Sequence, residues 1–521
     1  MTTTGGVRKR CNPSRTDQRR LRALGWSLCA AVGLLGGCGG GGGSSSSGPA
    51  GNGADSAVLA AHCVAPRGAS IVDADGRPYP DQPGTLANEL SWVRTWIDET
   101  YLWYQDVRGL SAATLDAARY ASPADYFDAL KTPAITASGK PKDAYHFVYD
   151  TPSWVALSRS GISYGYGFEI SFISARAPRS AVVAYTQPGT PAANAGIARG
   201  ARVLSVDGVD LVNDQTAAGV DALNAGLFPA AAGSHSFTLL DRGSASPRTV
   251  TLTASALTMA PVQNVKTLAA PNRSVGYLQF NDHIAPAELQ LVNAINQFVA
   301  AGVTDLVLDM RYNGGGYLDI ASELAFMVAG PGPTAGKVFE RMSFNDKNPF
   351  QLSDAQRSTG FHDAAVGFSA ARGQSLPRLN LRRVYLLAGA GTCSASEAVV
   401  NGLRGVGVDV VLIGGKTCGK PYGFYPTDNC GTTYFAIQFQ GVNQLGFGDY
   451  ADGFAPTCAA DDDFGHPLGD PSEGLLATAL GHRSTGVCQA GMSRALAATR
   501  DAVHSGPPLQ RPPARENRFY R

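Results

Sequence analysis

The sequence predicts a multidomain α/β protein with an N-terminal helical bundle, a β-rich domain with short helices, and a larger α/β body. Three observations support this prediction. Apolar residues first recur at helical spacing, then short alternating runs are separated by glycines, and finally longer apolar runs alternate with helical segments. The chain has 521 residues, enough for several hydrophobic cores. We place the three parts at residues 57–150, 160–257 and 258–490.

The first segment of the chain is typical of an export signal. Residues 1–37 carry seven basic residues and one acidic residue, and their apolar stretch suits a signal peptide but is too short to span a bilayer. The segment ends in Leu35-Gly36-Gly37-Cys38, which resembles a bacterial lipobox with Cys38 as the acylated residue. A Gly/Ser tether fills residues 38–56. We expect an exported protein that a lipid anchors to a bacterial membrane, where it faces the periplasm. The outer membrane is the favoured one. An ordinary signal peptide cleaved elsewhere is the alternative.

Charge and cysteine content fit that location. Without residues 1–37, 36 basic residues face 41 acidic ones, and no basic patch suggests nucleic acid. Six cysteines follow Cys38, an even number that favours disulfides in an oxidising compartment. Proximity favours the pairs Cys418–Cys430 and Cys458–Cys488, although six cysteines allow 15 connectivities. Because neither a CxxC pair nor an HExxH string occurs, we expect no metal site, and we expect no cofactor.

The N-terminal part has helical periodicity. Leu86, Leu90, Val93 and Ile97 share one helix face, and the aromatic residues at 101–104 and 126–127 supply further core. A binding platform built from these aromatics is the less favoured interpretation.

The β-rich part resembles a PDZ domain. Its first segment is Gly165-Tyr166-Gly167-Phe168, followed by a short helical stretch at 191–197 and the strand-like run 201–207. The resemblance implies that residues 165–168 form the loop that binds a peptide carboxylate. Backbone N–H groups there would hold the C-terminus of a protein substrate while the peptide adds a strand to the sheet edge.

The α/β body has a regular alternation of elements. Apolar runs predict strands at 275–280, from 305 and at 384–388 and 410–413; helices are expected at 285–301, at 317–328 and from 397. Leu289, Val292, Ile295 and Val299 lie in register on the first of these helices. The triple glycine 314–316 follows a buried strand, and its bare N–H groups suit either a tight turn or an oxyanion hole.

Ser394 and Lys420 form the candidate catalytic pair. Ser394 lies at a strand-to-helix turn, where unpaired N–H groups and the helix dipole favour a developing negative charge. Lys420 follows the next apolar strand, within Thr417-Cys418-Gly419-Lys420. A serine needs a base, and a buried lysine becomes one. On spacing alone, a capping serine and an unrelated surface lysine explain the pattern equally well.

Together these motifs resemble the C-terminal processing peptidases, which are serine peptidases with a Ser-Lys dyad and a crotonase/ClpP-like catalytic core. The resemblance covers residues 85–485. It implies Ser394 as nucleophile, Lys420 as general base, and the N–H groups of Gly315 and Ala395 as oxyanion donors, with Gly316 as a substitute for Gly315. Asp309, Arg311 and Asn313 would support the site.

Two features depart from the family pattern. Many relatives carry a glutamine four residues beyond the lysine, where it orients the amine, but this chain has Phe424. The serine-to-lysine spacing is also one residue longer than usual, which an insertion near residues 405–409 would explain. A different group must therefore orient the amine of Lys420.

Three alternative functions remain. The chain could be a non-catalytic PDZ scaffold that holds protein C-termini, a crotonase-like acyl-transfer enzyme, or a tricorn-like peptidase with a histidine base, for which His283 is best placed.

Two further segments have only weak sequence patterns. Residues 344–350 are a candidate lining of the substrate cleft. The proline- and arginine-containing tail, 491–521, is predicted to be disordered.

Overall fold

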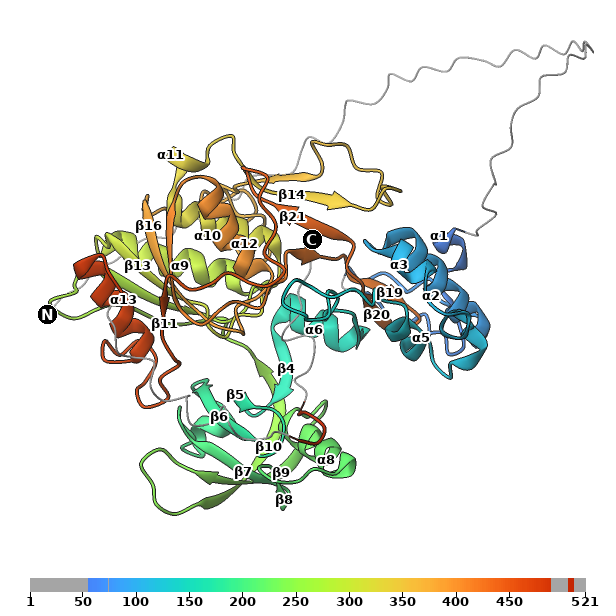
Figure 1. Ribbon diagram of the computed structural model, residues 1–521, viewed down its shortest axis with the longest axis horizontal. Helices are drawn as coiled ribbons and strands as arrows, with labels where there is room; N and C mark the ends of the chain where they lie inside the picture. The colour runs from blue at the N-terminus through green and yellow to red at the C-terminus, as the bar shows by residue number, and fades with distance from the viewer. Residues whose placement is uncertain (1–54, 74, 489–504, 510–521) are drawn as a thin grey trace, which may run out of the picture. The chain divides into compact units, whose positions relative to one another are not determined.

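The computed structural model describes residues 55–73, 75–488 and 505–509 (Figure 1). The predicted signal peptide, Cys38 and nearly all of the tether therefore lie outside the described residues. Within those ranges, no helix has both the length and the apolar character needed to cross a bilayer.

Helices dominate the N-terminal part, as predicted. The longest, α2 (Leu86–Thr100), is capped by Thr85, whose Oγ1 accepts a hydrogen bond from the N–H of Asn88. Leu90, Val93 and Ile97 on α2 are buried, which confirms the predicted apolar face. The remaining short elements are α1 (Ser56–Leu59), β1 (His62–Cys63), β2 (Gln82–Pro83), α3 (Tyr104–Arg108), α4 (Ala112–Leu115), η1 (Ala117–Arg119) and α5 (Pro123–Ala129).

These helices share their core with the α/β body instead of forming a separate bundle. Strand β3 (Phe147–Asp150) pairs with β20 (Thr432–Phe435), which in turn pairs with β19 (Thr427–Asn429). Ring centroids of Trp92 on α2 and Tyr434 on β20 lie 5.0 Å apart. A disulfide joins Cys63 to Cys430 across the same junction, so the predicted pair Cys418–Cys430 is wrong. Cys430 therefore pairs with a cysteine that is distant in sequence and not with the nearby Cys418.

After α6 (Thr151–Ser160), a seven-stranded sheet forms the PDZ-like part around its own apolar cluster. Its strand order is β4-β10-β9-β7-β6-β5, with β8 paired to β7, so β5 is an edge strand. Two helices, α7 (Pro191–Asn194) and α8 (Ala217–Leu227), complete it, and α7 occupies the predicted short helix. The strands are β4 (Ile162–Gly165), β5 (Phe168–Ser174), β6 (Ser180–Thr186), β7 (Arg202–Val206), β8 (Val209–Asp210), β9 (Gly233–Leu240) and β10 (Arg248–Thr258).

A six-stranded sheet of order β11-β12-β13-β16-β17-β22 forms the centre of the α/β body. Only its first pair, β11 with β12, is antiparallel. Successive residues face opposite sides: Leu386 packs in the cluster with α10 (Leu318–Ala329) and α12 (Ala395–Gly405), and Leu387 packs in the cluster with α13 (Gly474–Thr485). This two-sided burial explains the continuous apolar runs of the sequence. The strands are β11 (Val262–Thr267), β12 (Val275–Phe280), β13 (Asp305–Asp309), β16 (Arg383–Ala388), β17 (Asp409–Gly414) and β22 (Cys458–Ala459).

The helices of this body are α9 (Ala287–Ala300), α10 (Leu318–Ala329), α11 (Pro331–Thr334), α12 (Ala395–Gly405) and α13 (Gly474–Thr485). Three of them, α9, α10 and α12, occupy the predicted positions, and α9 buries a partly different face from the predicted one. On α9, Val292 and Ile295 are buried as predicted, but Leu289 and Val299 are 39% and 49% exposed. Phe298 takes the core position instead, because its larger apolar surface turns the helix toward that side.

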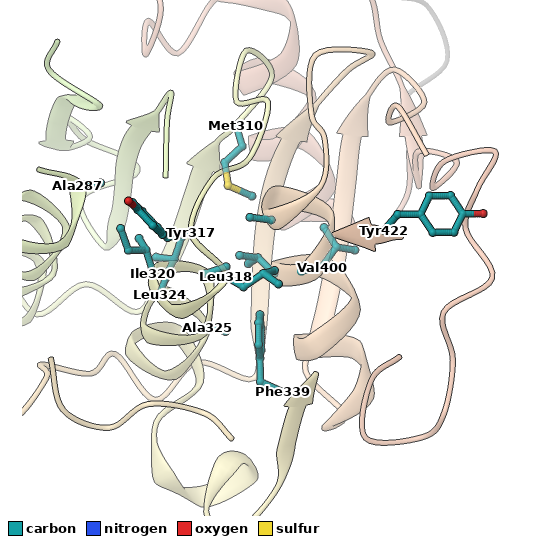
Figure 2. Close-up of a cluster of buried hydrophobic side chains, with 14 of the residues drawn as sticks. Ala287, Met310, Tyr317, Leu318, Ile320, Leu324, Ala325, Phe339, Val400 and Tyr422 are labelled. Carbon is teal, nitrogen blue, oxygen red and sulfur yellow. The ribbon is translucent and has the colours of Figure 1, made fainter. Parts of the chain in front are cut away.

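A second, four-stranded sheet of order β15-β14-β21-β18 covers the outer side of α10 and α12. Its strands are β14 (Val338–Phe344), β15 (Ser358–Gly360), β18 (Tyr422–Gly423) and β21 (Phe439–Val442). Figure 2 shows Leu324 of α10, Phe339 of β14 and Val400 of α12 gathered in one apolar cluster. This packing fixes α12, which Ser394 directly precedes.

The position of the segment 344–350 at a substrate cleft stays a prediction, and the segment is not among the residues that line the Ser394 cavity described below. The Asn345 side-chain amide donates to the carbonyl oxygens of Glu99 and Tyr101, and Lys347 pairs with Asp98. These contacts hold the segment against the N-terminal helices.

Part of the C-terminal tail is also ordered, contrary to prediction. In the described piece, residues 505–509, the N–H of Leu509 donates to the carbonyl of Ala175 at 2.9 Å. The Leu509 side chain is buried in the apolar cluster of the PDZ-like part. The prediction of disorder is therefore wrong for these five residues, because composition alone does not reveal a tertiary docking site; the other tail residues beyond 488 lie outside the described ranges.

Candidate active site

Ser394 occupies a sharp turn between β16 and α12. Its φ of +55° and ψ of −114° are unusual for a residue with a side chain. Such a conformation costs about 1–3 kcal/mol and persists only where the surroundings enforce it. The turn sets Ser394 directly before the N-terminus of α12, the position predicted from the sequence.

The carboxylate of Glu397 holds this turn in place. Its Oε2 accepts hydrogen bonds from the N–H groups of Ser394 (3.1 Å) and Lys420 (2.8 Å). Its Oε1 accepts from the Gly419 N–H at 2.9 Å and from Thr417 Oγ1 at 2.6 Å. Burial raises the pKa of Glu397, while these donors act in the opposite direction. Glu397 therefore joins the two loops that carry the candidate pair, a role that sequence reasoning missed.

A disulfide between Cys393 and Cys418 is the second link between these loops. Cys393 directly precedes Ser394, and Cys418 lies two residues before Lys420. The third disulfide, Cys458–Cys488, confirms the predicted pair.

Lys420 is enclosed by protein, with 1% of its surface exposed. Burial lowers the pKa of its amine from 10.5 to about 7, although the nearby charges of Asp143 and Glu397 act in the opposite direction. The amine nitrogen lies 4.1 Å from the ring centroid of Phe424 and 4.9 Å from that of Tyr145. The aromatic residue that replaces the family's glutamine thus faces the amine directly.

Ser394 and Lys420 line the same small cavity. Glu340 of β14 also lines it, and burial raises the pKa of that carboxyl group to about 8, so that Glu340 is largely protonated at pH 7. The sequence offered no signal for Glu340, because a strand position four residues before a loop has no distinctive pattern. The other lining residues are Leu318, Ala398, Pro421, Tyr422, Gly423 and Tyr450.

The glycine turn lies beside the Ser394 turn. The carbonyl of Asn313 accepts hydrogen bonds from the Cys393 N–H (3.1 Å) and from Ser396 Oγ (2.9 Å). Gly315 and Gly316 have φ values of +106° and +140°, which residues with side chains rarely adopt. The predicted oxyanion donors Gly315 and Ala395 therefore belong to adjoining turns.

The two glycines of this turn differ in their hydrogen bonds. The Gly315 N–H donates to Asn313 Oδ1 at 2.9 Å. For the Gly316 N–H, no acceptor is found among the described residues. In this conformation, the N–H of Gly316, which the sequence analysis gave as the substitute donor, is available to donate to an oxyanion. The choice between Gly315 and Gly316 as the oxyanion donor stays a prediction.

His283 lies behind the glycine turn, outside the residues that line the Ser394 cavity. Its Nδ1 is 3.0 Å from Asn313 Oδ1, and burial lowers its pKa to about 3. Because an amide oxygen only accepts, Nδ1 carries the proton. This arrangement supports the glycine turn and does not favour His283 as the base.

Predicted supporting residues form a buried ionic cluster below the turn. Arg311 pairs with Asp309, Glu473 and Asp462. From the PDZ-like part, Arg199 reaches the same cluster, pairing with Asp462 and donating to the Tyr312 hydroxyl. Asp309 and Arg311 thus support the structure of the loop. One residue of this ionic cluster, Arg199, comes from the PDZ-like part.

The predicted carboxylate-binding residues line a larger cavity of about 520 Å³. Gly165, Tyr166, Gly167 and Phe168 lie at its edge, together with Leu227 and Phe228 at the end of α8. The Tyr166 side chain itself is buried, and its hydroxyl donates to the Gly226 carbonyl. This segment therefore offers its backbone to the cavity, and its ligand stays a prediction.

Comparisons with known proteins agree with this architecture. Residues 274–425 match peptidase family S41, and residues 155–225 match the PDZ domain. Carboxyl-terminal-processing proteases from Picosynechococcus and Synechocystis are each 30% identical, over 138 and 137 residues. These alignments cover 26% of this chain, and the chain spans about a third of each relative's length (32% and 31%).

A solved structure assigned as an S41 protease from Bacteroides fragilis has the same fold. It superposes with a TM-score of 0.56 at 23% identity, covering 78% of this chain and 100% of that one. The predicted fold, a multidomain α/β protein with a PDZ domain and a peptidase core, is confirmed.

Proposed function

We propose that this chain belongs to peptidase family S41 and is a PDZ-containing serine endopeptidase of the C-terminal processing type. The observation that carries the proposal is the cavity shared by Ser394 and Lys420, where burial lowers the lysine pKa to about 7. An amine with that pKa is substantially neutral at pH 7 and is a competent base for a serine hydroxyl.

The reaction follows from these positions. Neutral Lys420 takes the proton of the Ser394 hydroxyl, and Ser394 Oγ bonds to the scissile carbonyl carbon. The resulting oxyanion is stabilised by the N–H groups of Ala395 and of Gly315 or Gly316. Lys420 then gives its proton to the leaving amine as the C–N bond breaks, and water hydrolyses the acyl-enzyme.

The substrate class follows from the PDZ domain. The strand β5 at the end of the sheet and the adjoining turn 165–168 suit capture of an extended peptide with a free C-terminus. We therefore propose proteins with exposed C-terminal tails as substrates.

Variants of the candidate pair test this function. With an unfolded substrate ending in apolar residues, Ser394→Ala and Lys420→Ala should each lower kcat by about 10⁴-fold or more. Lys416→Ala is the matched control, because Lys416 is an exposed lysine of the same loop. Full activity of Lys420→Ala would exclude the dyad. If the wild-type protein binds tails but cleaves none of the substrates, a scaffold role is correct instead.

We further propose that Cys38 carries a lipid anchor that holds the enzyme at a bacterial membrane facing the periplasm. The support is the lipobox-like sequence 35–38, the preceding basic and apolar segment, and the tether after it. When the protein is expressed with a labelled fatty acid, the wild type should carry the label. The variant Cys38→Ala should carry no label and should appear in the soluble fraction. Membrane association of Cys38→Ala equal to that of wild type would contradict the anchor.

A further inference from the structure

One carboxyl group, that of Glu340, lies in the cavity that Ser394 and Lys420 share. Glu340 lines this cavity from β14, and only 6% of its surface is exposed. Within the part of the chain that the structure describes, its side chain makes no hydrogen bond and no ion pair. Burial raises the pKa of this carboxyl group to about 8. Because burying a polar group without a partner destabilises a fold, its place beside the nucleophile calls for a functional explanation.

The strand directs the Glu340 side chain inward. Along β14, Glu340 and Met342 are buried, whereas Arg341 and Ser343 are exposed. Met342 fills its inward position with an apolar side chain of the core cluster. Gly441 of β21 makes room for the acid, because a β-carbon at position 441 would lie 2.4 Å from Glu340 Cδ. The fold therefore accommodates a carboxyl group at a position where an apolar side chain would pack.

Glu340 is not the counter-ion of Lys420. The charges that act on the Lys420 amine are those of Asp143 and Glu397. Among the described residues, no ion pair joins Glu340 to the lysine. The Glu397 carboxylate already accepts hydrogen bonds from the loops that carry the candidate pair. The carboxyl group of Glu340 is therefore available to a group that enters the cavity.

The position of the cavity identifies that group. Leu318 at the start of α10 and Ala398 in the first turns of α12 line the cavity together with Ser394. In the proposed reaction, the scissile carbonyl carbon bonds to Ser394 Oγ while its oxygen accepts from the Ala395 N–H. The residue that carries this carbonyl group thus lies against Ser394, and the adjoining cavity receives its side chain.

The size of the cavity limits which side chain enters. Its volume of about 10 Å³ has room for about one water-sized group. Beyond the β-carbon, a hydroxyl or a methyl group fits this space, and a longer chain does not. The carboxyl group of Glu340 favours the hydroxyl, because a hydroxyl both donates and accepts a hydrogen bond. A methyl group does neither and would leave the buried acid without a partner.

We propose that Glu340 is a specificity-determining residue that selects substrates with a serine immediately before the scissile bond. The serine hydroxyl hydrogen-bonds to the Glu340 carboxyl group inside the cavity. The inference rests on the proposed peptidase function and adds the chemistry of the cleavage site to it. It does not depend on which tail the PDZ-like part binds, since the two cavities have different lining residues.

Two peptides that differ in one group test this selection on the full-length protein. The residue before the chosen bond is serine in one peptide and 2-aminobutyrate in the other, which has a methyl group in place of the hydroxyl. Both peptides end in the same apolar tail, and mass spectrometry of the products restricts kcat/KM to cleavage at that bond. The wild type should prefer the serine peptide by about ten-fold or more, because the analogue leaves a buried polar group unpaired.

Variants on the same strand assign this preference to Glu340. Glu340→Met removes the carboxyl group but keeps a side chain of similar length, so the ratio of the two kcat/KM values should fall to about one. Glu340→Gln keeps a donor and an acceptor and should retain most of the preference. Arg341→Met is the matched control, because Arg341 is the exposed neighbour on β14, and its ratio should equal that of the wild type. The Tm of Glu340→Met should be no lower than that of the wild type, since the variant no longer buries an unpaired carboxyl group.

The outcomes separate this inference from the function on which it rests. A wild-type ratio near one overturns the selection and leaves the peptidase proposal intact. A serine preference that persists in Glu340→Met, with both peptides cleaved more slowly and a lower Tm, gives Glu340 a structural role and overturns the inference. Should Glu340→Met fail to fold, Glu340→Leu replaces it with the same expected ratio. If the wild type cleaves neither peptide, the proposed function and the inference fail together.

Discussion

The amine of Lys420 lies against two aromatic rings, where many relatives would place an amide. Phe424 and Tyr145 exclude water from it, and their ring faces attract the charged form only modestly. Desolvation is therefore the larger effect, and it explains the lowered pKa. The ring of Phe424 packs against this amine, and the Glu397 carboxylate accepts a hydrogen bond from the Lys420 backbone N–H.

The first prediction concerns pH. The neutral amine is the active form, so kcat/KM for a short peptide substrate should rise with pH through about 7 and then level off. Phe424→Leu opens space for water beside the amine, so its pKa should rise toward the ordinary value and the profile should shift to higher pH. A rate that stays flat from about pH 5 to about pH 9, with chemistry limiting, would contradict a lysine base.

The second prediction concerns Glu397. In Glu397→Gln, the side chain keeps only one acceptor oxygen and turns an NH₂ group toward donors. Leaving buried donors unpaired costs about 1–3 kcal/mol, so kcat should fall roughly 10- to 100-fold and Tm should decrease. Steady-state kinetics and thermal unfolding measure both effects. Ser353→Ala, an exposed change in a distant loop, is the control, and unchanged kcat in Glu397→Gln would show that the loops are held by other contacts.

Local chemistry made Ser394 and Lys420 predictable from sequence, whereas their neighbours were not. A serine before a helix and a lysine after a strand have recognisable surroundings. Glu397 was visible only as a helix residue, because its partners Gly419 and Lys420 are more than 20 positions away. Glu340 comes from a different sheet and had no signal at all.

At the scale of elements, the loops after β16 and β17 are fixed to each other at two points. The Glu397 carboxylate is one, and the Cys393–Cys418 disulfide is the other. Because the parallel strands β16 and β17 are adjacent, their carboxyl ends bring the two loops to the same edge of the sheet. The disulfide makes this proximity covalent.

The third prediction concerns that disulfide. Closing a loop of about 25 residues stabilises a protein by about 3 kcal/mol in the chain-entropy description. The double variant Cys393→Ala/Cys418→Ala should lower Tm and also reduce kcat, since the strained Ser394 turn loses a constraint. The pair Cys458→Ala/Cys488→Ala is the matched control, because that disulfide lies away from the cavity and should affect Tm alone. Equal kcat losses in both variants would contradict a local effect.

The positions of helices and strands along the chain were predicted from the sequence more accurately than the faces that they bury. Strands buried on both sides and helices of 11–14 residues left clear periodic runs, and the observed bounds differ from those expected by one or two residues. On α9, two apolar stripes compete, and only the tertiary packing of Phe298 decides between them. Strand β3 was hidden because its partner, β20, is nearly 300 residues away.

At the scale of the whole molecule, one arginine links the PDZ domain to the glycine turn. Arg199 follows α7 and contacts Asp462 and Tyr312, and Tyr312 directly precedes Asn313 of that turn. A ligand that displaces the PDZ domain would therefore change the charge balance around Arg311, which shares Asp462.

The fourth prediction tests this link. Arg199→Met keeps the length of the side chain but removes its charge, so cleavage of substrates with a PDZ-bound tail should slow by about ten-fold, typical of coupling energies between sites. The Kd of a tail peptide for the PDZ domain should not change. Arg242→Met is the control, because this exposed PDZ arginine donates to the Gly465 carbonyl but does not touch the ionic cluster. Equal effects of the two variants would exclude a specific link.

Sequence patterns could not reveal these long-range contacts. The pairing of Cys63 with Cys430 and the docking of Leu509 both join residues more than 300 positions apart. Such contacts depend on the assembled fold, and no local periodicity encodes them.

The disulfide beside Ser394 has a consequence for the cell that makes this protein. A newly synthesised chain in a reducing cytosol keeps Cys393 and Cys418 as thiols, and its nucleophile and base are then held together less firmly. On the proposed export route, oxidation in the periplasm would then join the two loops covalently. The proposed peptidase would thus reach its full activity after export, and proteins of the cytosol would meet a less active form.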